Sequence, residues 1–410
     1  MRALPALKTM PEMIMGQALD DKLCILPEYD ETIRQKSIPE RLIALQDIYQ
    51  IFIPNKMSRE IYSKLYLSLL RSIQKKQSIF AVRQYHENSK MIRQKSYESI
   101  IGGSDSFTII GPSGIGKSSA VSRAINILTE VPVLNLENTN VIACLQVQAP
   151  ADSSVKGLLL EILRKADEML QTNYHQNAMK SHPTVDMLIG TVAQVSLNHI
   201  GLLIVDEIQN VVNSKNGKTV IGTLTQLINN SGVSICMVGT PESTIFFDQA
   251  MMLARRSLGL NYTRMEYGEE FRQLCTVLLE YCYVQNLPQV DEPMLMWLYN
   301  HSSGNASVVV GLIHDAQEIA ILEGLERLDV STLNIAFEKR MTMLHDFLTP
   351  KSAKTNPVKK KKSELPDIVE EHCAADLVSI YQVSMNAKEF QNDILEELKR
   401  NGIPIVEVAI

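Results

Sequence analysis

The chain has 410 residues, which predicts two to three domains at about 150 residues each. Hydrophobic residues make up 45% of it and charged residues 21%, as in ordinary globular proteins. No apolar run approaches the ~20 residues of a membrane span, and the N-terminus is too polar for a secretory signal, so we expect no membrane partner. The net charge of −6 excludes a protein that is basic throughout, but it leaves room for a local basic surface.

The cysteines form neither a CxxC pair nor a Cys/His cluster. This spacing argues against zinc sites and a disulfide scaffold, and it favours a reducing, cytoplasmic location. The six cysteines are Cys24, Cys144, Cys236, Cys275, Cys282 and Cys373.

Positive charge gathers in the N-terminal part of the chain. From Lys56 to Lys95 there are ten basic residues and two acidic ones. Residues 58–77 also carry apolar residues at three- and four-residue spacing, which predicts a helix. The basic face of this helix is either a solvated surface or one that contacts phosphates. We assign residues 1–98 to an N-terminal helical extension with a basic face.

The middle of the chain alternates between strand and helix patterns, which predicts an α/β fold with a parallel sheet covered by helices on both faces. We assign residues 99–267 to this nucleotide-binding domain. The predicted strands are 107–111, 141–148, 201–208 and 233–240, and the predicted helices are 118–129, 153–171, 184–198 and 218–230.

The remainder of the chain is predicted to be helical and then to contain a linker. Residues 268–348 read as a helical lid, with Asp291 and Ser331 at expected N-cap positions. Residues 349–366 are rich in Lys and Pro, which indicates a solvated linker, with a nuclear signal or a nucleic-acid tether as alternatives. The tail, 367–410, contains one amphipathic helix pattern, a possible docking element for a partner.

The sequence GPSGIGKS, from Gly111 to Ser118, matches the pattern G-x-x-x-x-G-K-[ST] between a predicted strand and a predicted helix. Its glycines allow the backbone to wrap closely around phosphates, and its N–H groups form an anion cradle. Lys117 supplies a positive charge, and Ser118 offers a hydroxyl to Mg²⁺. The residues expected to bind nucleotide are Gly111, Pro112, Ser113, Gly114, Ile115, Gly116, Lys117, Ser118 and Ser119.

The sequence LLIVDE, residues 202–207, predicts a buried strand that ends in two carboxylates. Ligands of open α/β sheets bind at this carboxyl edge of the strands. Asp206 is suited to hold Mg²⁺, and Glu207 is suited to activate water for attack on a γ-phosphate. The alternative is a pair of surface acids, but the upstream P-loop makes hydrolysis the better interpretation.

Two later features have open interpretations. Thr240 follows a predicted strand, where its hydroxyl either lies beside the attacking water or caps the next turn. Arg255 and Arg256 are adjacent, so on a helix they point in different directions. One of them is either an arginine finger that reaches the γ-phosphate of a neighbouring subunit or a surface arginine with an internal salt bridge.

Together these features look like the AAA+ ATPase superfamily. Within it, the sequence resembles the TnsC/TniB transposition regulators, including those of CRISPR-associated transposons. Three stretches carry the resemblance, which runs from about Ile38 to Phe337. They are IPERLIALQDIYQIFIPN (38–55), the P-loop, and VQAPADSSVKGLLLEILRKADEMLQTNY (147–174).

The resemblance implies an AAA+ P-loop NTPase fold with an N-terminal helical extension and a C-terminal helical lid. It implies a bacterial ATPase that uses ATP and Mg²⁺ and assembles with itself, as a ring or helical filament, on duplex DNA. It also implies that the protein connects a target-selection protein of the TniQ/TnsD type to a DDE transposase.

The resemblance also assigns roles to residues. Lys117 and Ser118 contact the nucleotide, Asp206 contacts magnesium and Glu207 contacts water. The further implied roles are sensor 1 for Thr240, a contact across the subunit boundary for Arg255 or Arg256, and DNA-backbone contacts for Lys156, Ser153 and Ser154, with Lys180 and Ser181 in the next loop as weaker candidates.

The sequence departs from the AAA+ pattern in its lid. A sensor-2 arginine is usual there, but no Arg or Lys occurs from Gly304 to Asp315. This difference predicts slow hydrolysis or a switch-like role. Two other functions stay open: a helicase-loader or initiator-like ATPase in replication, and a signalling NTPase that does not bind DNA.

Overall fold

The structure is a computed structural model that describes residues 10–76, 106–136, 139–152, 154–181, 183–211, 217–244 and 259–341. All of them lie in the first of the two units into which the chain divides, Met1–Pro350. The predicted linker and tail helix lie outside the described residues.

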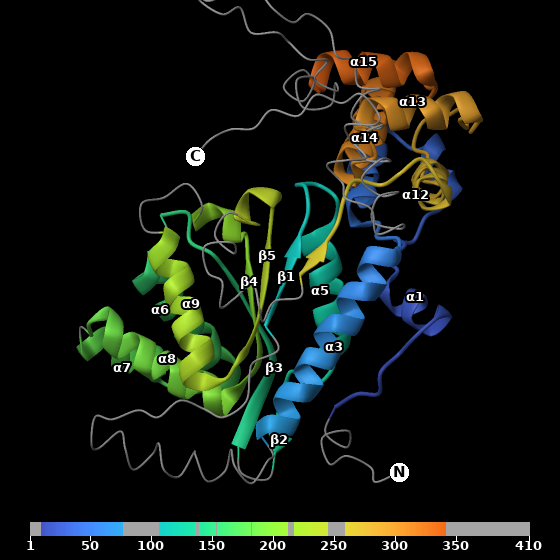
Figure 1. The fold of residues 1–410 in the computed structure, drawn as a ribbon. Helices are drawn as coiled ribbons and strands as arrows, with labels where there is room; N and C mark the ends of the chain where they lie inside the picture. The colour runs from blue at the N-terminus through green and yellow to red at the C-terminus, as the bar shows by residue number, and fades with distance from the viewer. Residues whose placement is uncertain are drawn as a thin grey trace, which may run out of the picture. The chain divides into compact units, whose positions relative to one another are not determined.

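A six-stranded sheet forms the centre of the described α/β part, in the order β2-β3-β4-β5-β1-β6 (Figure 1). The strand pairs are parallel except β2 with β3, which is antiparallel. The predicted α/β fold is therefore confirmed, with one antiparallel edge strand that the sequence pattern did not predict. The strands are β1 (Phe107–Ile110), β2 (Val133–Leu136), β3 (Thr139–Gln148), β4 (Ile200–Asp206), β5 (Ser234–Gly239) and β6 (Leu260–Asn261).

Helices cover both faces of this sheet, as the alternating pattern predicts. The four helices expected in this part are found within two residues of their predicted ends, and a short extra one, α7 (Tyr174–Ser181), was not predicted. In Figure 1, α6, α8 and α9 lie on one face, and α3 and α5 lie on the other. Their bounds are α3 (Lys56–Lys76), α5 (Lys117–Leu128), α6 (Val155–Leu170), α8 (Val185–His199) and α9 (Gly217–Ser231).

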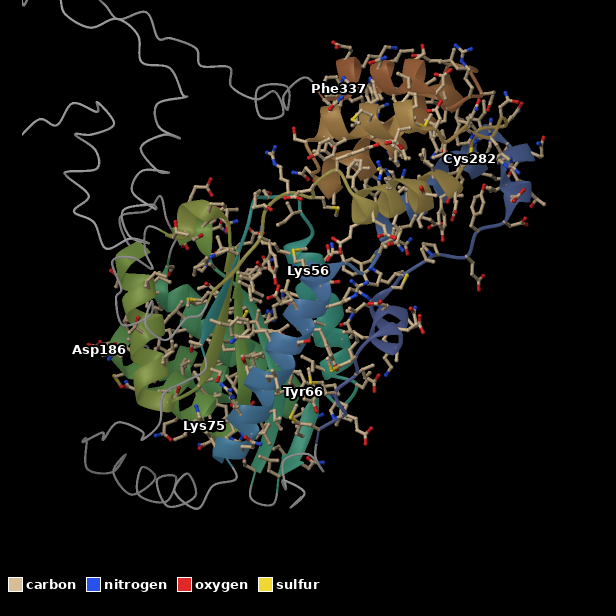
Figure 2. The ribbon with its side chains drawn as sticks, turned by 45° about the vertical axis from the view of Figure 1, so that its right-hand side comes forward. Lys56, Tyr66, Lys75, Asp186, Cys282 and Phe337 are labelled. Atoms are coloured by element: carbon tan, nitrogen blue, oxygen red, sulfur yellow. The ribbon has the colours of Figure 1, made fainter. Side chains whose placement is uncertain are left out.

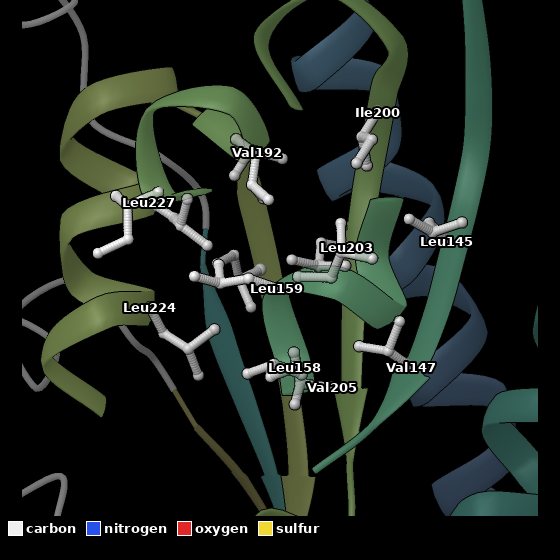
Figure 3. Close-up of a cluster of buried hydrophobic side chains, with 14 of the residues drawn as sticks. Leu145, Val147, Leu158, Leu159, Val192, Ile200, Leu203, Val205, Leu224 and Leu227 are labelled. Carbon is white, nitrogen blue, oxygen red and sulfur yellow. The ribbon is translucent and has the colours of Figure 1, made fainter. Parts of the chain in front are cut away.

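A cluster of buried aliphatic side chains fills the space between the sheet and helices α6, α8 and α9. Branched side chains from β3 and β4 meet leucines and valines of α6, α8 and α9 (Figure 3). Each fully buried side chain of this size stabilises the fold by about 1.5–3 kcal/mol. The labelled members are Leu145, Val147, Leu158, Leu159, Val192, Ile200, Leu203, Val205, Leu224 and Leu227.

The N-terminal segment contributes to two different hydrophobic cores. Leu45 and Ile48 pack with the lid helices, whereas Ile61, Leu65 and Leu69 of α3 pack with the sheet. Alternating Tyr, Ile and Leu at helical spacing explains why α3 buries one whole face. The elements before α3 are α1 (Gln17–Leu23), η2 (Glu31–Gln35), α2 (Ile38–Ala44) and η3 (Leu45–Gln50).

Several basic residues of α3 interact with other parts of the molecule. Figure 2 labels Lys56 and Lys75, which lie near the two ends of this helix. Arg59 pairs with Asp20 at 2.6 Å, and the Lys64 ammonium lies 5.4 Å from the centre of the Phe107 ring. Lys76 donates to the Ser196 carbonyl at 2.9 Å, at the end of α8, and burial lowers the pKa of Lys76 to about 7. These residues therefore serve the fold, which neither interpretation of the basic helix anticipated.

The helical stretch after the sheet folds as expected into α12 (Glu269–Glu280), α13 (Glu292–Ser302), α14 (Ala306–Leu322) and α15 (Val330–Arg340). Asp291 caps α13, as predicted, by accepting from the Met294 N–H at 2.9 Å. The predicted cap at Ser331 was wrong, because Asp329 caps α15 and forms a capping box with Thr332.

The next two observations concern membrane-spanning helices and cysteines. None of the helices in the described ranges is long and apolar enough to cross a membrane. The cysteines in those ranges, Cys24, Cys144, Cys236, Cys275 and Cys282, are free thiols. Cys373 lies outside the described residues.

Candidate nucleotide site

The P-loop connects β1 to α5 and is shaped by two glycines with left-handed backbone. Gly114 has φ 82° and Gly116, the N-cap of α5, has φ 95°. The Gly111 N–H donates to the Gly239 carbonyl at 3.2 Å, which ties the loop to the end of β5. A Cβ on Gly111 would lie 2.9 Å from the Tyr262 carbonyl, so this glycine is needed for close packing.

Lys117 is buried at the start of α5 with 8% of its surface exposed. Its Nζ donates to the carbonyls of Gly111 at 2.7 Å and Pro112 at 2.8 Å. Burial lowers the pKa of Lys117, and the charges of the nearby carboxylates Asp206 and Glu207 act against this shift. Lys117 of the P-loop therefore interacts electrostatically with Asp206 and Glu207.

Asp206 and Glu207 lie at the carboxyl end of β4. Asp206 is 4% exposed, and its Oδ1 accepts from the Glu207 N–H at 2.8 Å. The adjacent peptide is also held, because the Ala149 N–H donates to the Asp206 carbonyl at 2.8 Å. Glu207 has φ 56°, a left-handed conformation that costs a non-glycine residue about 1 kcal/mol or more. The chain therefore turns sharply at the proposed base.

Gln209 connects Glu207 to the end of β5, a contact that sequence reasoning missed. Its Nε2 donates to the Glu207 carboxylate, and its Oε1 accepts from the Thr240 N–H at 3.3 Å. This side chain lies in η4 (Ile208–Val211), directly after the two acids. A polar residue two positions beyond the DE pair was the available signal.

Thr240 lies at the N-cap position of η5 (Pro241–Ser243), but its side chain makes no capping bond there. Its hydroxyl instead bonds to Glu242, and this bond is the main cause of the lowered pKa of Glu242. The charge of Lys117 lowers that pKa further. Glu242 is therefore a third carboxylate near Lys117, which the sequence analysis did not identify.

The start of lid helix α14 is hydrogen-bonded to the P-loop. Asn305 Nδ2 donates to the Ser113 carbonyl at 2.9 Å, and the Ser307 N–H donates to the Gly114 carbonyl at 3.0 Å. Both contacts are uncharged. They occur in the stretch where a sensor-2 arginine was expected and not found.

The donor set suits a magnesium nucleotide. Ser118 and Asp206 offer hard oxygen atoms, the ligands that Mg²⁺ prefers, beside a loop rich in N–H donors. The N–H groups in the first turn of α5 have no partner within their own helix, and they are free to bind an anion.

Residues 101–244 match the family of AAA domains named AAA_22. This part of the chain is an AAA domain. The arrangement of the sheet, P-loop and covering helices is that of the AAA+ P-loop fold. No curated protein sequence matches the chain.

The chain is also similar in structure to three solved proteins. The ORC1 protein of Aeropyrum pernix in complex with DNA has 14% identity and a TM-score of 0.41, and the match covers 62% of this chain and 64% of that one. The chain therefore spans less than two thirds of that protein. A Drosophila ORC structure bound to DNA has 13% identity and a TM-score of 0.43, covering 98% and 86%. Domain III of the Thermotoga maritima replication initiation protein DnaA has 15% identity and a TM-score of 0.36, covering 67% and 94%.

The predicted DNA contacts of the AAA domain fall on two helices. Ser154 caps α6 by accepting from the Gly157 N–H at 3.0 Å, and Lys156 is exposed in the first turn. Lys180 and Ser181 form the last turn of α7, so their predicted place in a loop was wrong. Ser153, Arg255 and Arg256 lie outside the described residues.

A second cluster of possible metal ligands, on α14, is engaged by side chains of α15 and the N-terminal segment. His314, Asp315 and Glu318 lie close enough together to share a cation. Arg340 pairs with Glu318 at 2.7 Å and lies 3.8 Å from Asp315, and Gln46 lies 3.1 Å from His314 Nε2. We assign this cluster to lid packing.

Proposed function

We propose that the chain is an ATPase in which Glu207 activates the attacking water. The observation that best supports this is the buried Lys117 of the P-loop at the same edge of the parallel strands as Asp206 and Glu207, which lie at the carboxyl end of β4. One lysine and two acids at this edge leave an excess of negative charge, which repels a triphosphate. A divalent cation would remove this repulsion and polarise the phosphates, and Ser118 and Asp206 are the residues that would hold it.

Each residue then has a distinct task. Lys117 contributes a positive charge at the β- and γ-phosphates, and the P-loop N–H groups orient them. Glu207 accepts a proton from water, and Gln209 holds its carboxylate in place. Thr240, at the end of the neighbouring strand, has the sensor-1 role.

We further propose that the protein assembles on duplex DNA and regulates transposition, as its resemblance to TnsC/TniB proteins implies. Lys156 and Ser154 occupy a helix N-terminus, where both the dipole and the side chains favour DNA phosphates. Backbone contacts tolerate any sequence and weaken steeply with salt. A partner of the TniQ/TnsD type would therefore choose the target, a DDE transposase would act on it, and Arg255 or Arg256 would complete the neighbouring subunit's site.

The test measures ATP hydrolysis and sedimentation of the purified chain with duplex DNA, with and without ATP. Wild type is expected to form large ATP-dependent complexes. Lys117→Ala abolishes them, because the phosphates lose their main cation, whereas Glu207→Gln retains them and hydrolyses ATP about 100-fold more slowly. Lys36→Ala, which changes an exposed lysine far from the P-loop in sequence, is the control.

The outcomes separate the functions. Normal assembly by Lys117→Ala contradicts the nucleotide site. Hydrolysis by wild type with no shift of duplex DNA contradicts the DNA role and leaves a signalling NTPase. Assembly that recruits a replicative helicase rather than a transposase supports a loader instead.

A further inference from the structure

The lid meets the P-loop through two main-chain carbonyl groups of the loop. The Ser113 carbonyl accepts from Asn305 Nδ2 at 2.9 Å, and the Gly114 carbonyl accepts from the Ser307 N–H at 3.0 Å. Asn305 is 7% exposed, so water competes little for its bond. Two consecutive carbonyls of the loop are therefore held by the first turn of α14.

This contact is closely fitted on both sides. A Cβ on Gly114 would lie 2.4 Å from Ser307 Oγ and 2.6 Å from Asn305 Oδ1. On the other side of the turn, the Met265 N–H donates to the Gly304 carbonyl at 3.0 Å, and a Cβ on Gly304 would lie 2.0 Å from the Met265 carbonyl. Glycine at both positions lets the lid approach to hydrogen-bond distance.

The orientation of the Asn305 amide follows from its neighbours. Its oxygen accepts from the Ser307 N–H at 3.2 Å and from Ser307 Oγ at 3.1 Å, as an N-cap does. The amide nitrogen therefore faces the Ser113 carbonyl. One side chain caps α14 and also donates to the P-loop, and only the second task requires an N–H group.

Peptide planarity links this contact to the nucleotide. The Ser113 carbonyl and the Gly114 N–H belong to one rigid unit, and the Gly114 carbonyl and the Ile115 N–H belong to the next. A phosphate that binds the N–H ends of these units fixes the direction of their carbonyl ends. By reciprocity, a lid that holds the carbonyl ends favours phosphate binding at the N–H ends.

We propose that Asn305 and Ser307 form a latch through which the lid senses occupancy of the P-loop. The latch acts on the loop main chain, in the segment that lacks Arg and Lys, so the lid responds to phosphate without touching it. Asn305 is thus a positioning residue. This inference rests on the proposed nucleotide binding and adds how the lid is coupled to it.

The test substitutes Asn305→Asp in the full chain. Aspartate caps helices as well as asparagine does, but it presents only acceptors to the Ser113 carbonyl. We expect the affinity for a fluorescent ATP analogue to fall about tenfold. In wild type, the analogue should slow hydrogen exchange at residues 303–309, and this gain in protection should disappear in the variant.

Two further variants test whether the effect arises from the bond between Asn305 and the P-loop. Asp291→Asn makes the reverse exchange at the cap of α13, where Asp291 accepts from the Met294 N–H of its own helix, and it should leave affinity and protection unchanged. Asn305→Ser keeps a cap but is too short to reach the loop, so it decides the question if Asn305→Asp folds poorly. Thermal unfolding without nucleotide checks that each chain is folded at the temperature of the assay.

Two results would overturn the latch. If wild type binds the analogue and both Asn305 variants bind it equally well with the same gain in protection, the latch is wrong and the nucleotide site stands. If wild type binds no nucleotide, the latch and the proposed function both fail.

Discussion

The P-loop edge of the sheet and the lid differ in where their charged groups lie. At the sheet edge, charged groups crowd at the ends of buried strands, and the backbone is bent around them, as at Glu207 with φ 56°. The lid meets this edge through the uncharged Asn305 and Ser307. A largely buried ion pair, Arg41 with Glu326, joins the lid to the N-terminal segment instead. In the function that we propose, charge thus supports chemistry at the sheet edge, whereas in the lid it supports the architecture.

The largest expected effect is a loss of stability when the ion pair of the lid is broken. Arg41 is 2% exposed and bonds to both oxygens of Glu326 at 2.7 Å and to the Tyr283 carbonyl at 3.2 Å. Arg41→Met should lower the free energy of unfolding by about 3 kcal/mol, because Glu326 is left largely buried without its partner. Urea unfolding followed by the fluorescence of Trp297, the chain's single tryptophan, measures this.

Two further variants sharpen that result. Lys22→Met removes an exposed ion pair with Glu130 and should cost less than about 1 kcal/mol. The double variant Arg41→Met, Glu326→Met should recover much of the loss, because no unpaired charge remains. Equal losses in the single and double variants would mean that Arg41 acts by packing alone.

The next effect concerns the sheet edge. Gln209→Ala should lower the hydrolysis rate about tenfold and leave nucleotide affinity unchanged, because Glu207 loses the donor that directs its carboxylate. Gln209→Glu keeps an acceptor for Thr240 but places a like charge beside Glu207, so its rate should fall further. Gln50→Ala removes a comparable amide–carboxylate bond, to Asp47, far from the site and is the control. A faster Gln209→Ala enzyme would show that Gln209 restrains Glu207.

The sequence predicts a region well when the residues that define it lie close together along the chain. The P-loop and the Asp206–Glu207 pair were predictable, because glycine spacing and a strand ending in acids are local patterns. The latch joins residues 192 positions apart, and Arg41 meets a partner 285 positions away. No local pattern encodes such pairs. The cap at Asp329 was missed by two residues, because Ser and Asp are equally suited to cap a helix.

The charge excess around α3 shows the same limit. A run of basic residues predicts a positive surface, but Lys76 turns inward to the last carbonyls of α8, 120 positions away. The periodicity of residues 58–77 predicted the helix, and most of its apolar residues are buried, although Leu67 is 44% exposed. Which lysines reach across to a neighbouring helix depends on packing that the periodicity does not contain.

The smallest expected effect is a pH dependence of the unfolding free energy that arises from the Arg41–Glu326 pair. The hydrogen bond from Arg41 is the main cause of the lowered pKa of Glu326. A carboxyl with a folded pKa below its unfolded value of about 4.3 stabilises the protein above that pH and loses this contribution as the pH falls through the folded value. The difference in unfolding free energy between wild type and Glu326→Gln should therefore shrink, by about 1 kcal/mol, as the pH falls from 5 toward 3.

The matched variant is Glu292→Gln, since the pKa of Glu292 is also lowered, by bonds from Tyr267 and Arg272, but its side chain is 56% exposed. Solvent screens exposed pairs, so its difference from wild type should change less with pH. If Glu292→Gln changes as much as Glu326→Gln, the acid dependence reflects ordinary surface titration. A change confined to Glu326 supports its role in joining the N-terminal segment to the lid through a largely buried charge pair.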